Sequence, residues 1–313
     1  MSTFSFEASL ILKMRRLLTT FFLTALFVGL PRQARAQSSE DSGKALIWYE
    51  SVNGSSSSLG TVTRFDSTLG YNFNRHFAMN FGVPVLFVHA SSSTATTGYC
   101  SANGIGDVYT DLRFTFLNPA VNFISTVRGS LPTSSTTKGF SSGRVTADWN
   151  NHFDRTFGRV TPYAELGIAN TVPQSNYFER PYTTLGLTGH FEGGASIKLL
   201  RALNFHASAY AIEPSGQQKV FSKLLNRQSG SPGPGTSHGG VFQNAPETVG
   251  SADIARDHGF SLGFNASPFH YVDFALGYTR SVSFDLNTVY FGVGFNLARF
   301  LGSSSRNQGG IWQ

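Results

Sequence analysis

The sequence predicts an all-β fold: a closed antiparallel transmembrane β-barrel of about 12 strands after a cleaved N-terminal signal peptide. Three observations support this prediction: a low charge content, a two-residue alternation of apolar and polar positions, and an alternation of short with long connections. Only 13% of the 313 residues are charged, whereas the chain contains 33 Gly and 29 Phe. The mean hydropathy is −0.10, so apolar residues must alternate with polar ones, as in strands that face lipid on one side.

The N-terminus has the organisation of a secretory signal peptide. A basic segment at residues 13–16 precedes an apolar run at 17–30, and Ala34-Arg35-Ala36 supplies a small-x-small cleavage site. The alternative is a transmembrane helix, but such a helix needs about 20 apolar residues. We therefore expect residues 1–36 to be removed, with Met14 as an alternative translation start.

The mature chain should comprise a barrel at 37–300 and a polar tail at 301–313. Cleavage removes five basic residues and one acidic residue, which leaves 19 Lys and Arg against 17 Asp and Glu. This near balance leaves no basic stripe and argues against a nucleic-acid partner. Cys100 is the only cysteine, so an intramolecular disulfide is excluded and a free thiol in a loop is expected.

Period-2 alternation recurs along the mature chain and predicts twelve strands long enough to cross a membrane when tilted. In residues 77–88, every odd position carries Phe, Met or Val. The predicted strands are 44–52, 61–73, 77–88, 106–116, 120–131, 143–153, 160–170, 184–197, 203–212, 258–267, 271–282 and 286–297. Pro84 and Pro162 fall inside two of them, and each requires a β-bulge or a shifted strand end.

The predicted connections alternate in length, as periplasmic turns and external loops do in outer-membrane barrels. The short ones are 74–76, 117–119, 154–159, 198–202 and 268–270. The long ones are 53–60, 89–105, 132–142, 171–183 and 213–257. The segment 283–285 is short where the pattern requires a long loop. We expect 213–257, which contains Ser231-Pro232-Gly233-Pro234-Gly235, to be a mobile loop; the alternative is a linker between two domains.

Two segments resemble a known family. Gly104-Ile105-Gly106-Asp107-Val108 leads through Leu112 and Arg113 into Phe114, and a second stretch at 130–143 contains Leu-Pro-Thr and Lys-Gly-Phe-Ser-Ser-Gly. Both resemble marked segments of the outer-membrane transporter-like β-barrel family named after the meta-cleavage pathway of phenol degradation. The resemblance is specific across 104–143. It implies a transporter for small, often hydrophobic or aromatic compounds.

The last predicted strand contains Tyr290-x-Gly292-x-x-Phe295-x-Leu297. This pattern resembles the C-terminal signal by which the barrel-assembly machinery recognises its clients, and the alternative is an ordinary amphipathic strand. Expected partners are therefore the barrel-assembly machinery, outer-membrane lipids and small-molecule solutes, with the bacterial outer membrane as the location.

Charged residues recur on the parity that faces the lumen. They are Arg64, Asp66, Asp111, Arg113, Arg128, Arg144, Asp148, Glu165, His190, Glu192 and Lys198. Two roles remain open: mutual pairing that fills the interior, or a lining that sets selectivity. Pairing is the expectation for most of them. Asp107, Arg128 and Arg144 are the exception, because all three should lie near the outer mouth. Their net positive charge should favour anionic or neutral solutes.

No catalytic, cofactor or metal site is predicted. His152 with Asn150 or Asn151 is the best candidate for a lipid-hydrolase pair, yet the alternation places His152 toward the lumen. Gly104-x-Gly106 lacks the third glycine of a dinucleotide fingerprint. The eight histidines include no i, i+4 pair. A passive channel is therefore the leading hypothesis, ahead of a plugged structural or surface-interaction barrel and a lipid-modifying enzyme.

Overall fold

The computed structural model describes residues 45–57, 60–90, 101–118, 120–173, 178–224, 247–269 and 271–297. The predicted signal peptide, the polar tail, Cys100 and the Pro-Gly segment 231–235 lie outside these residues. No helix among the described residues is long and apolar enough to cross a membrane.

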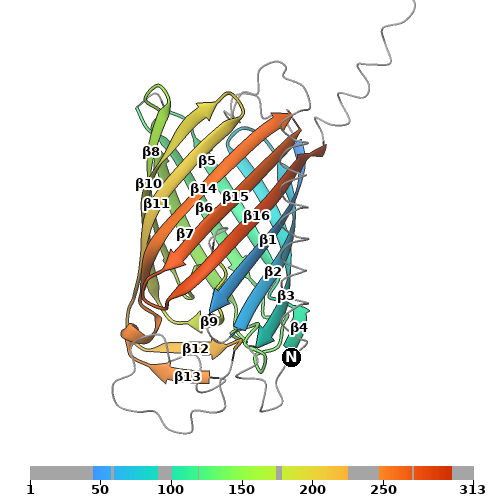
Figure 1. The fold of residues 1–313 in the computed structure, drawn as a ribbon, viewed down its shortest axis with the longest axis vertical. Helices are drawn as coiled ribbons and strands as arrows, with labels where there is room; N and C mark the ends of the chain where they lie inside the picture. Colours follow the sequence, from blue (N-terminus) through green and yellow to red (C-terminus); the bar gives the residue numbers. More distant parts are fainter. Residues whose placement is uncertain are drawn as a thin grey trace, which may run out of the picture. The chain divides into compact units, whose positions relative to one another are not determined.

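Twelve of the described strands form one antiparallel sheet that closes into a barrel, as predicted (Figure 1). The barrel strands are β1 (Ala45–Ser57), β2 (Gly60–Asn72), β3 (Phe77–Ala90), β5 (Tyr109–Phe116), β6 (Asn122–Ser130), β7 (Thr146–Asp154), β8 (Val160–Ala169), β10 (Thr188–Leu200), β11 (Leu203–Pro214), β14 (Asp257–Phe269), β15 (Val272–Ser281) and β16 (Leu286–Asn296). β1 pairs with β2 and with β16, and β2 also pairs with β3, which closes the ring.

The alternation of side chains separates a polar interior from an apolar exterior. Successive residues of a strand point to opposite faces, and β2 shows the result: Arg64 and Asp66 are 4% and 7% exposed, whereas Phe65 between them is 45% exposed. Trp48 on β1 and Phe81 on β3 are likewise exposed. An apolar outer surface around a polar interior is the arrangement of a barrel surrounded by lipid.

Pro84 is accommodated by a β-bulge in the neighbouring strand. Val85 pairs with Ile105 at the end of β4 (Ser101–Ile105), whereas Gly82 pairs with Tyr109 at the start of β5. Between these two pairs, β3 advances by three residues while the facing chain advances by four, from Ile105 to Tyr109. The extra residue defines a bulge at 106–108. The Pro84 carbonyl accepts a 2.8 Å hydrogen bond from the Gly106 amide. The N–H and C=O of one residue point to the same neighbouring strand, so an N–H at Pro84 would also face the bulge. Because the ladder is interrupted there, the missing N–H costs no ladder hydrogen bond.

Pro162 lies at a ladder end instead, and no bulge is found there. Its carbonyl accepts a hydrogen bond from Arg155, just beyond the last pair between β7 and β8, Asp154 with Tyr163. Its absent N–H would face the same side. The strand therefore loses no ladder bond at this proline.

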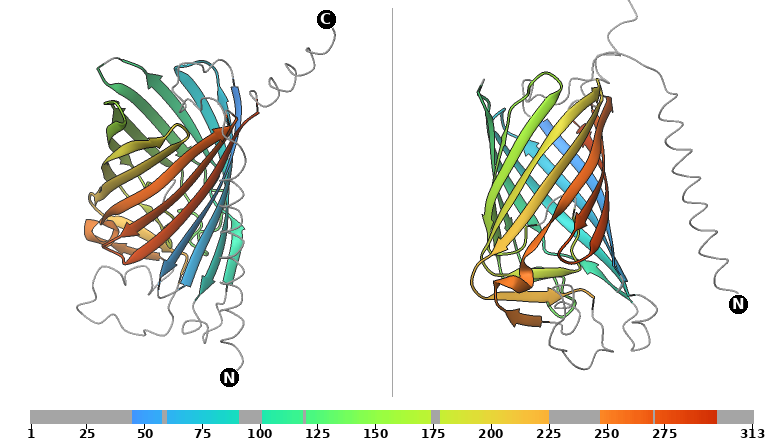
Figure 2. Two further views of the ribbon diagram at one scale, coloured as in Figure 1. Left: turned by 45° about the horizontal axis from the view of Figure 1, so that its top comes forward. Right: turned by 60° about the vertical axis from the view of Figure 1, so that its left-hand side comes forward.

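The five turns predicted at 74–76, 117–119, 154–159, 198–202 and 268–270 connect strands at one end of the barrel, here called the turn end, where β1 also begins and β16 ends. The short connection 283–285 joins β15 to β16 at the other end. The opposite end is called the loop end, and both views in Figure 2 show the strands tilted between the two. The predicted loop 53–60 is wrong, because β1 continues to Ser57 and β2 starts at Gly60. The small polar residues that suggested a loop, such as Asn53 and Ser55, are buried on the lumen side. The loop 89–105 is likewise shortened by β3 and β4.

The predicted long loop 213–257 is partly structured. It contributes β12 (Gln218–Ser222), β13 (Glu247–Gly250) and a short 3-10 helix, η4 (Ala252–Ala255). β12 pairs with β13 and with β9 (Tyr182–Leu185), and Figure 1 shows this small sheet at the loop end. The predicted strand 184–197 therefore started too early, because β10 begins at Thr188 and Thr184 belongs to β9.

Candidate functional site: the barrel lumen

One side of the lumen carries ion-paired arginines and is called the arginine wall; it consists of Arg64, Asp66, Tyr109, Asp111 and Arg128. Arg128 donates two hydrogen bonds to the Asp111 carboxylate, at 2.6 and 2.8 Å. Its guanidinium lies 4.3 Å from the centre of the Tyr109 ring. Arg64 forms an ion pair with Asp66, which also accepts a 2.9 Å hydrogen bond from Tyr109 Oη. The charges of this wall compensate one another.

The adjoining part of the wall carries carboxylates with histidine partners and is called the carboxylate wall; it consists of Asp148, His152, Glu165, His190 and Glu192 on β7, β8 and β10. The two regions meet where Arg128 on β6 is the direct cross-strand partner of Asp148 on β7. His190 Nε2 lies 2.8 Å from Asp148 Oδ1, and His152 Nδ1 lies 2.8 Å from Glu165 Oε1. The four side chains of these two pairs are between 12% and 28% exposed. Solvent and solutes in the lumen can therefore reach them.

Glu165 and Glu192 occupy directly opposed positions on β8 and β10. Glu192 accepts a 2.9 Å hydrogen bond from Tyr163 Oη, and Glu165 accepts a 3.0 Å bond from the Asn150 amide. Like charges on opposed cross-strand positions destabilise a sheet. This arrangement concentrates negative charge on one side of the lumen.

Two glycines allow large side chains to lie flat across a strand. A Cβ on Gly82 would come 2.1 Å from the Tyr109 ring, and a Cβ on Gly167 would come 2.1 Å from the His190 ring. The space lets Tyr109 reach across β3 to Asp66 and lets His190 reach across β8 to Asp148. Sequence reasoning missed both positions, although inward-facing glycine parity is a signal that could have found them.

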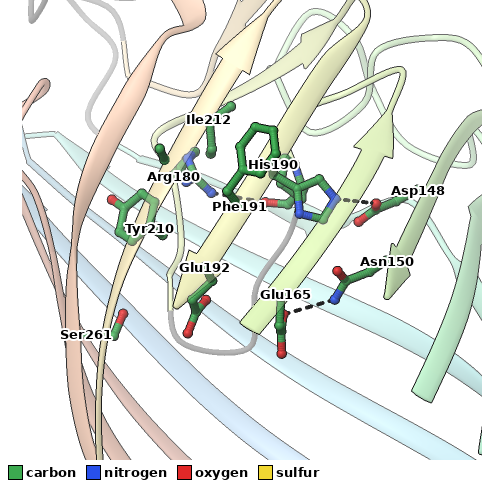
Figure 3. A pocket seen from close by; sticks show the side chains of 12 residues that line it. Asp148, Asn150, Glu165, Arg180, His190, Phe191, Glu192, Tyr210, Ile212 and Ser261 are labelled. Atoms are coloured by element: carbon green, nitrogen blue, oxygen red, sulfur yellow. Dashed lines mark hydrogen bonds and ion pairs between the residues drawn. The ribbon is translucent and has the colours of Figure 1, made fainter. Parts of the chain in front are cut away.

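A small cavity of about 100 Å³ adjoins the carboxylate wall (Figure 3). It is lined by Asp148, Asn150, Glu165, Pro173, Arg180, His190, Phe191, Glu192, Tyr210, Ala211, Ile212 and Ser261. One water needs about 10–15 Å³ of such volume, so the cavity is large enough for several waters or a small solute. Its polar lining is dominated by the carboxylates, with Arg180 as the cation.

The small sheet at the loop end, with the residues that connect to it, is here called the plug; it comprises 178–185, 218–224 and 247–255. A single apolar cluster joins it to the barrel interior. Its buried members are Val62, Leu86, Val88, Phe140, Val172, Phe178, Tyr182, Ile212, Val220, Leu224, Phe284 and Leu286. Because these residues come from β2, β3, β11 and β16 as well as from the plug and loops, the cluster crosses the lumen.

Asp107 holds the segment 131–143, here called the strap, against the bulge. Its carboxylate accepts hydrogen bonds from the Ser134 amide at 3.1 Å and from Ser141 Oγ at 2.8 Å. At Gly139, φ is +69°, and a Cβ there would come 2.1 Å from the Ser222 carbonyl of the plug. The two segments of the family resemblance are therefore in direct contact, and they place Phe140 in the apolar cluster.

The remaining predicted lumen residues are distributed differently. Arg113 donates a 3.3 Å hydrogen bond to Asn72. Arg144 is exposed and lies outside β7, because β7 begins at Thr146 and the strand alternation does not extend to it. Lys198 is exposed near the turn end of β10. The structure thus brings Asp148, Glu165, His190 and Glu192 together. Among the described contacts, Arg128 pairs with Asp111, and none joins it to Arg144.

The described residues give little support to catalysis. His152 contacts Glu165 within the lumen. Residues 139–143 have the Gly-x-Ser-x-Gly spacing of a hydrolase elbow, but they form a loop, and Ser141 donates to Asp107. A second such sequence, 235–239, lies outside the described residues. Within the described ranges, no group of three or more His, Cys, Asp or Glu side chains could hold a metal ion.

Among solved structures, the chain is similar to an outer-membrane channel from Pseudomonas putida F1, with a TM-score of 0.54 and 10% identity over 84% of this chain and 100% of that one. The chain has the fold of an outer-membrane channel. Weaker similarity extends to the KdgM porin in complex with disordered oligogalacturonate, at a TM-score of 0.42 and 8% identity, over 80% of this chain and 98% of the porin. No protein-family model and no curated protein matches the chain. Fold and apolar exterior together place the protein in the bacterial outer membrane.

Proposed function

We propose that this barrel is a passive outer-membrane channel for small solutes. The observation that carries the proposal is the polar, partly exposed carboxylate wall beside a cavity, next to a region of the lumen wall whose charges compensate one another. A barrel that served only as a scaffold would not be expected to retain Glu165 opposite Glu192, because like charges on opposed cross-strand positions destabilise a sheet. Charged lumen linings are how channels select among solutes.

The apolar cluster that crosses the lumen limits what can pass in the described conformation. Larger solutes therefore require the plug to move. The family resemblance across 104–143 adds small hydrophobic or aromatic compounds as candidates. Passage of such compounds is part of the proposal and depends on that resemblance.

Liposome swelling tests the proposal directly. Proteoliposomes should swell in sugars, amino acids or small aromatic compounds at rates that fall with solute size, whereas liposomes with a heat-denatured sample should not. No swelling in any solute would reject the channel and favour the second candidate, a plugged barrel with a structural or surface-interaction role. The apolar cluster across the lumen is the observation that favours this second candidate.

A further inference from the structure

The plug is attached to the barrel wall by a buried carboxylate. Glu179 is 2% exposed. Its carboxylate forms an ion pair with Lys223 in the plug, at 2.5 Å, and a longer one with Arg64 on β2, at 3.6 Å. Burial lowers the pKa of the Lys223 ammonium, and the neighbouring Glu179 carboxylate opposes that effect. One side chain thus links plug and wall.

A second link joins Arg180 of the plug to Asp257, at the start of β14. The guanidinium of Arg180 lies 3.3 Å from the Asp257 carboxylate, which is 1% exposed. The same carboxylate accepts hydrogen bonds from Tyr210 on β11, at 3.1 Å, and from Ser281 on β15, at 2.5 Å. Both links therefore cross the same boundary between plug and wall.

Each charged group at this boundary has a further partner on its own side. Within the plug, Glu179 keeps Lys223 if the plug moves away. On the wall, Arg64 keeps Asp66. Separation along this boundary therefore leaves neither member of the Arg64–Glu179 pair as an isolated charge, which would otherwise be the main cost of breaking a buried ion pair.

The second link divides in the same way. Asp257 keeps its two hydroxyl donors on the wall. Within the plug, Arg180 keeps the ring of Phe178, 4.1 Å from the guanidinium, whereas its 3.1 Å hydrogen bond to the Pro173 carbonyl reaches the loop after β8. Buried ion pairs add little net stability compared with apolar packing, and their best-attested use is to specify or switch a conformation. A permanent seal would need only the apolar cluster.

We propose that the plug is a gate, closed over the lumen by the Glu179–Arg64 and Arg180–Asp257 links and built to separate as a unit along this boundary. The inference rests on the proposed channel function. Apolar packing around Phe140 and Val220 favours the closed gate, which opens transiently. Opening removes the plug from above the cavity and lets larger solutes reach the carboxylate wall.

Hydrogen–deuterium exchange of the purified protein tests the gate without requiring solute flux. Glu179→Gln keeps a hydrogen-bonding group beside Lys223 but removes the charge that faces Arg64. The amides of β9 and β12 should exchange about tenfold faster in this variant, whereas those of β2 and β14 should not change. Arg180→Gln, which acts through the second link, should produce the same pattern and serves if Glu179→Gln does not fold.

Asp111→Asn is the matched control, because Asp111 is also buried and paired with an arginine, but within the wall. Unchanged exchange of β9 and β12 in a folded Glu179→Gln or Arg180→Gln protein would overturn the gate. An equal increase in Asp111→Asn would overturn it too, since any buried carboxylate would then suffice. Faster plug exchange without swelling by any variant would show that the boundary separates, but it would reject the channel proposal and, with it, the gating role.

Discussion

Two neighbouring regions of the lumen wall use charge in opposite ways. In the arginine wall, Arg128 and Asp111 compensate each other through a bidentate pair. In the carboxylate wall, Glu165 and Glu192 stand on opposed cross-strand positions, and their partners include neutral donors such as Tyr163. The comparison teaches that paired charge consolidates a barrel wall, whereas clustered like charge costs stability and remains available to solutes.

The largest expected contrast is in stability. Asp111→Asn leaves Arg128 without its carboxylate and should lower the free energy of unfolding by about 3 kcal/mol. The same carboxylate-to-amide change in Glu192→Gln relieves repulsion with Glu165. It should lower the free energy of unfolding by less than about 0.5 kcal/mol, or raise it. Urea unfolding in micelles, followed by Trp fluorescence, measures both. Equal losses would show that the two walls do not differ energetically.

Ion selectivity should depend on the carboxylate wall. Changing Glu165 and Glu192 together to Gln removes two negative charges from the lumen and should lower the cation-to-anion permeability ratio about threefold. Asp111→Asn should change the ratio less, because Asp111 and Arg128 neutralise each other. Reversal potentials in planar bilayers under a salt gradient measure the ratio. An unchanged ratio in the double variant would mean that permeating ions avoid this wall.

The two inward glycines offer a matched pair of substitutions. Gly167→Ala should push the His190 ring off Asp148 and raise the cation preference, by up to about twofold, because Asp148 loses its partner. Gly82→Ala should displace Tyr109 and cost about 1–3 kcal/mol of stability through overpacking. Selectivity should persist in Gly82→Ala, since Asp66 retains Arg64. If both variants changed selectivity alike, general lumen distortion would be the cause.

The smallest changes in ion selectivity are expected at the outer mouth. Arg144→Glu should shift the reversal potential modestly toward cations, whereas Arg128→Glu should mainly destabilise the barrel, because Arg128 is held by Asp111. Arg280 is the control: it lies on the lipid-facing parity of β15 and contacts Asn287 and Asp285. Arg280→Ala should leave selectivity unchanged. A larger shift from Arg128→Glu than from Arg144→Glu would restore the predicted cationic mouth.

Much of the lumen could be predicted from the sequence, because strand alternation assigns each side chain to a face. Asp148, Glu165, His190 and Glu192 were all expected to face inward, and the structure gathers them. Strand alternation does not predict which inward-facing side chains contact one another. The Arg128–Asp111 pair required the register of β5 with β6, where the two residues are direct partners. Arg144 was misplaced because alternation was extended past the strand end.

By itself, the sequence determined the barrel, its strand number and its orientation of faces. These follow from local, repeated patterns, since a period of two residues and the length of a tilted strand are properties of each segment alone. Only the tertiary structure decided that a small sheet lies at the loop end and that an apolar cluster joins it to the barrel interior. β9, β12 and β13 are short strands of four or five residues from distant parts of the chain. Their pairing depends on contacts across the barrel, which no local pattern records.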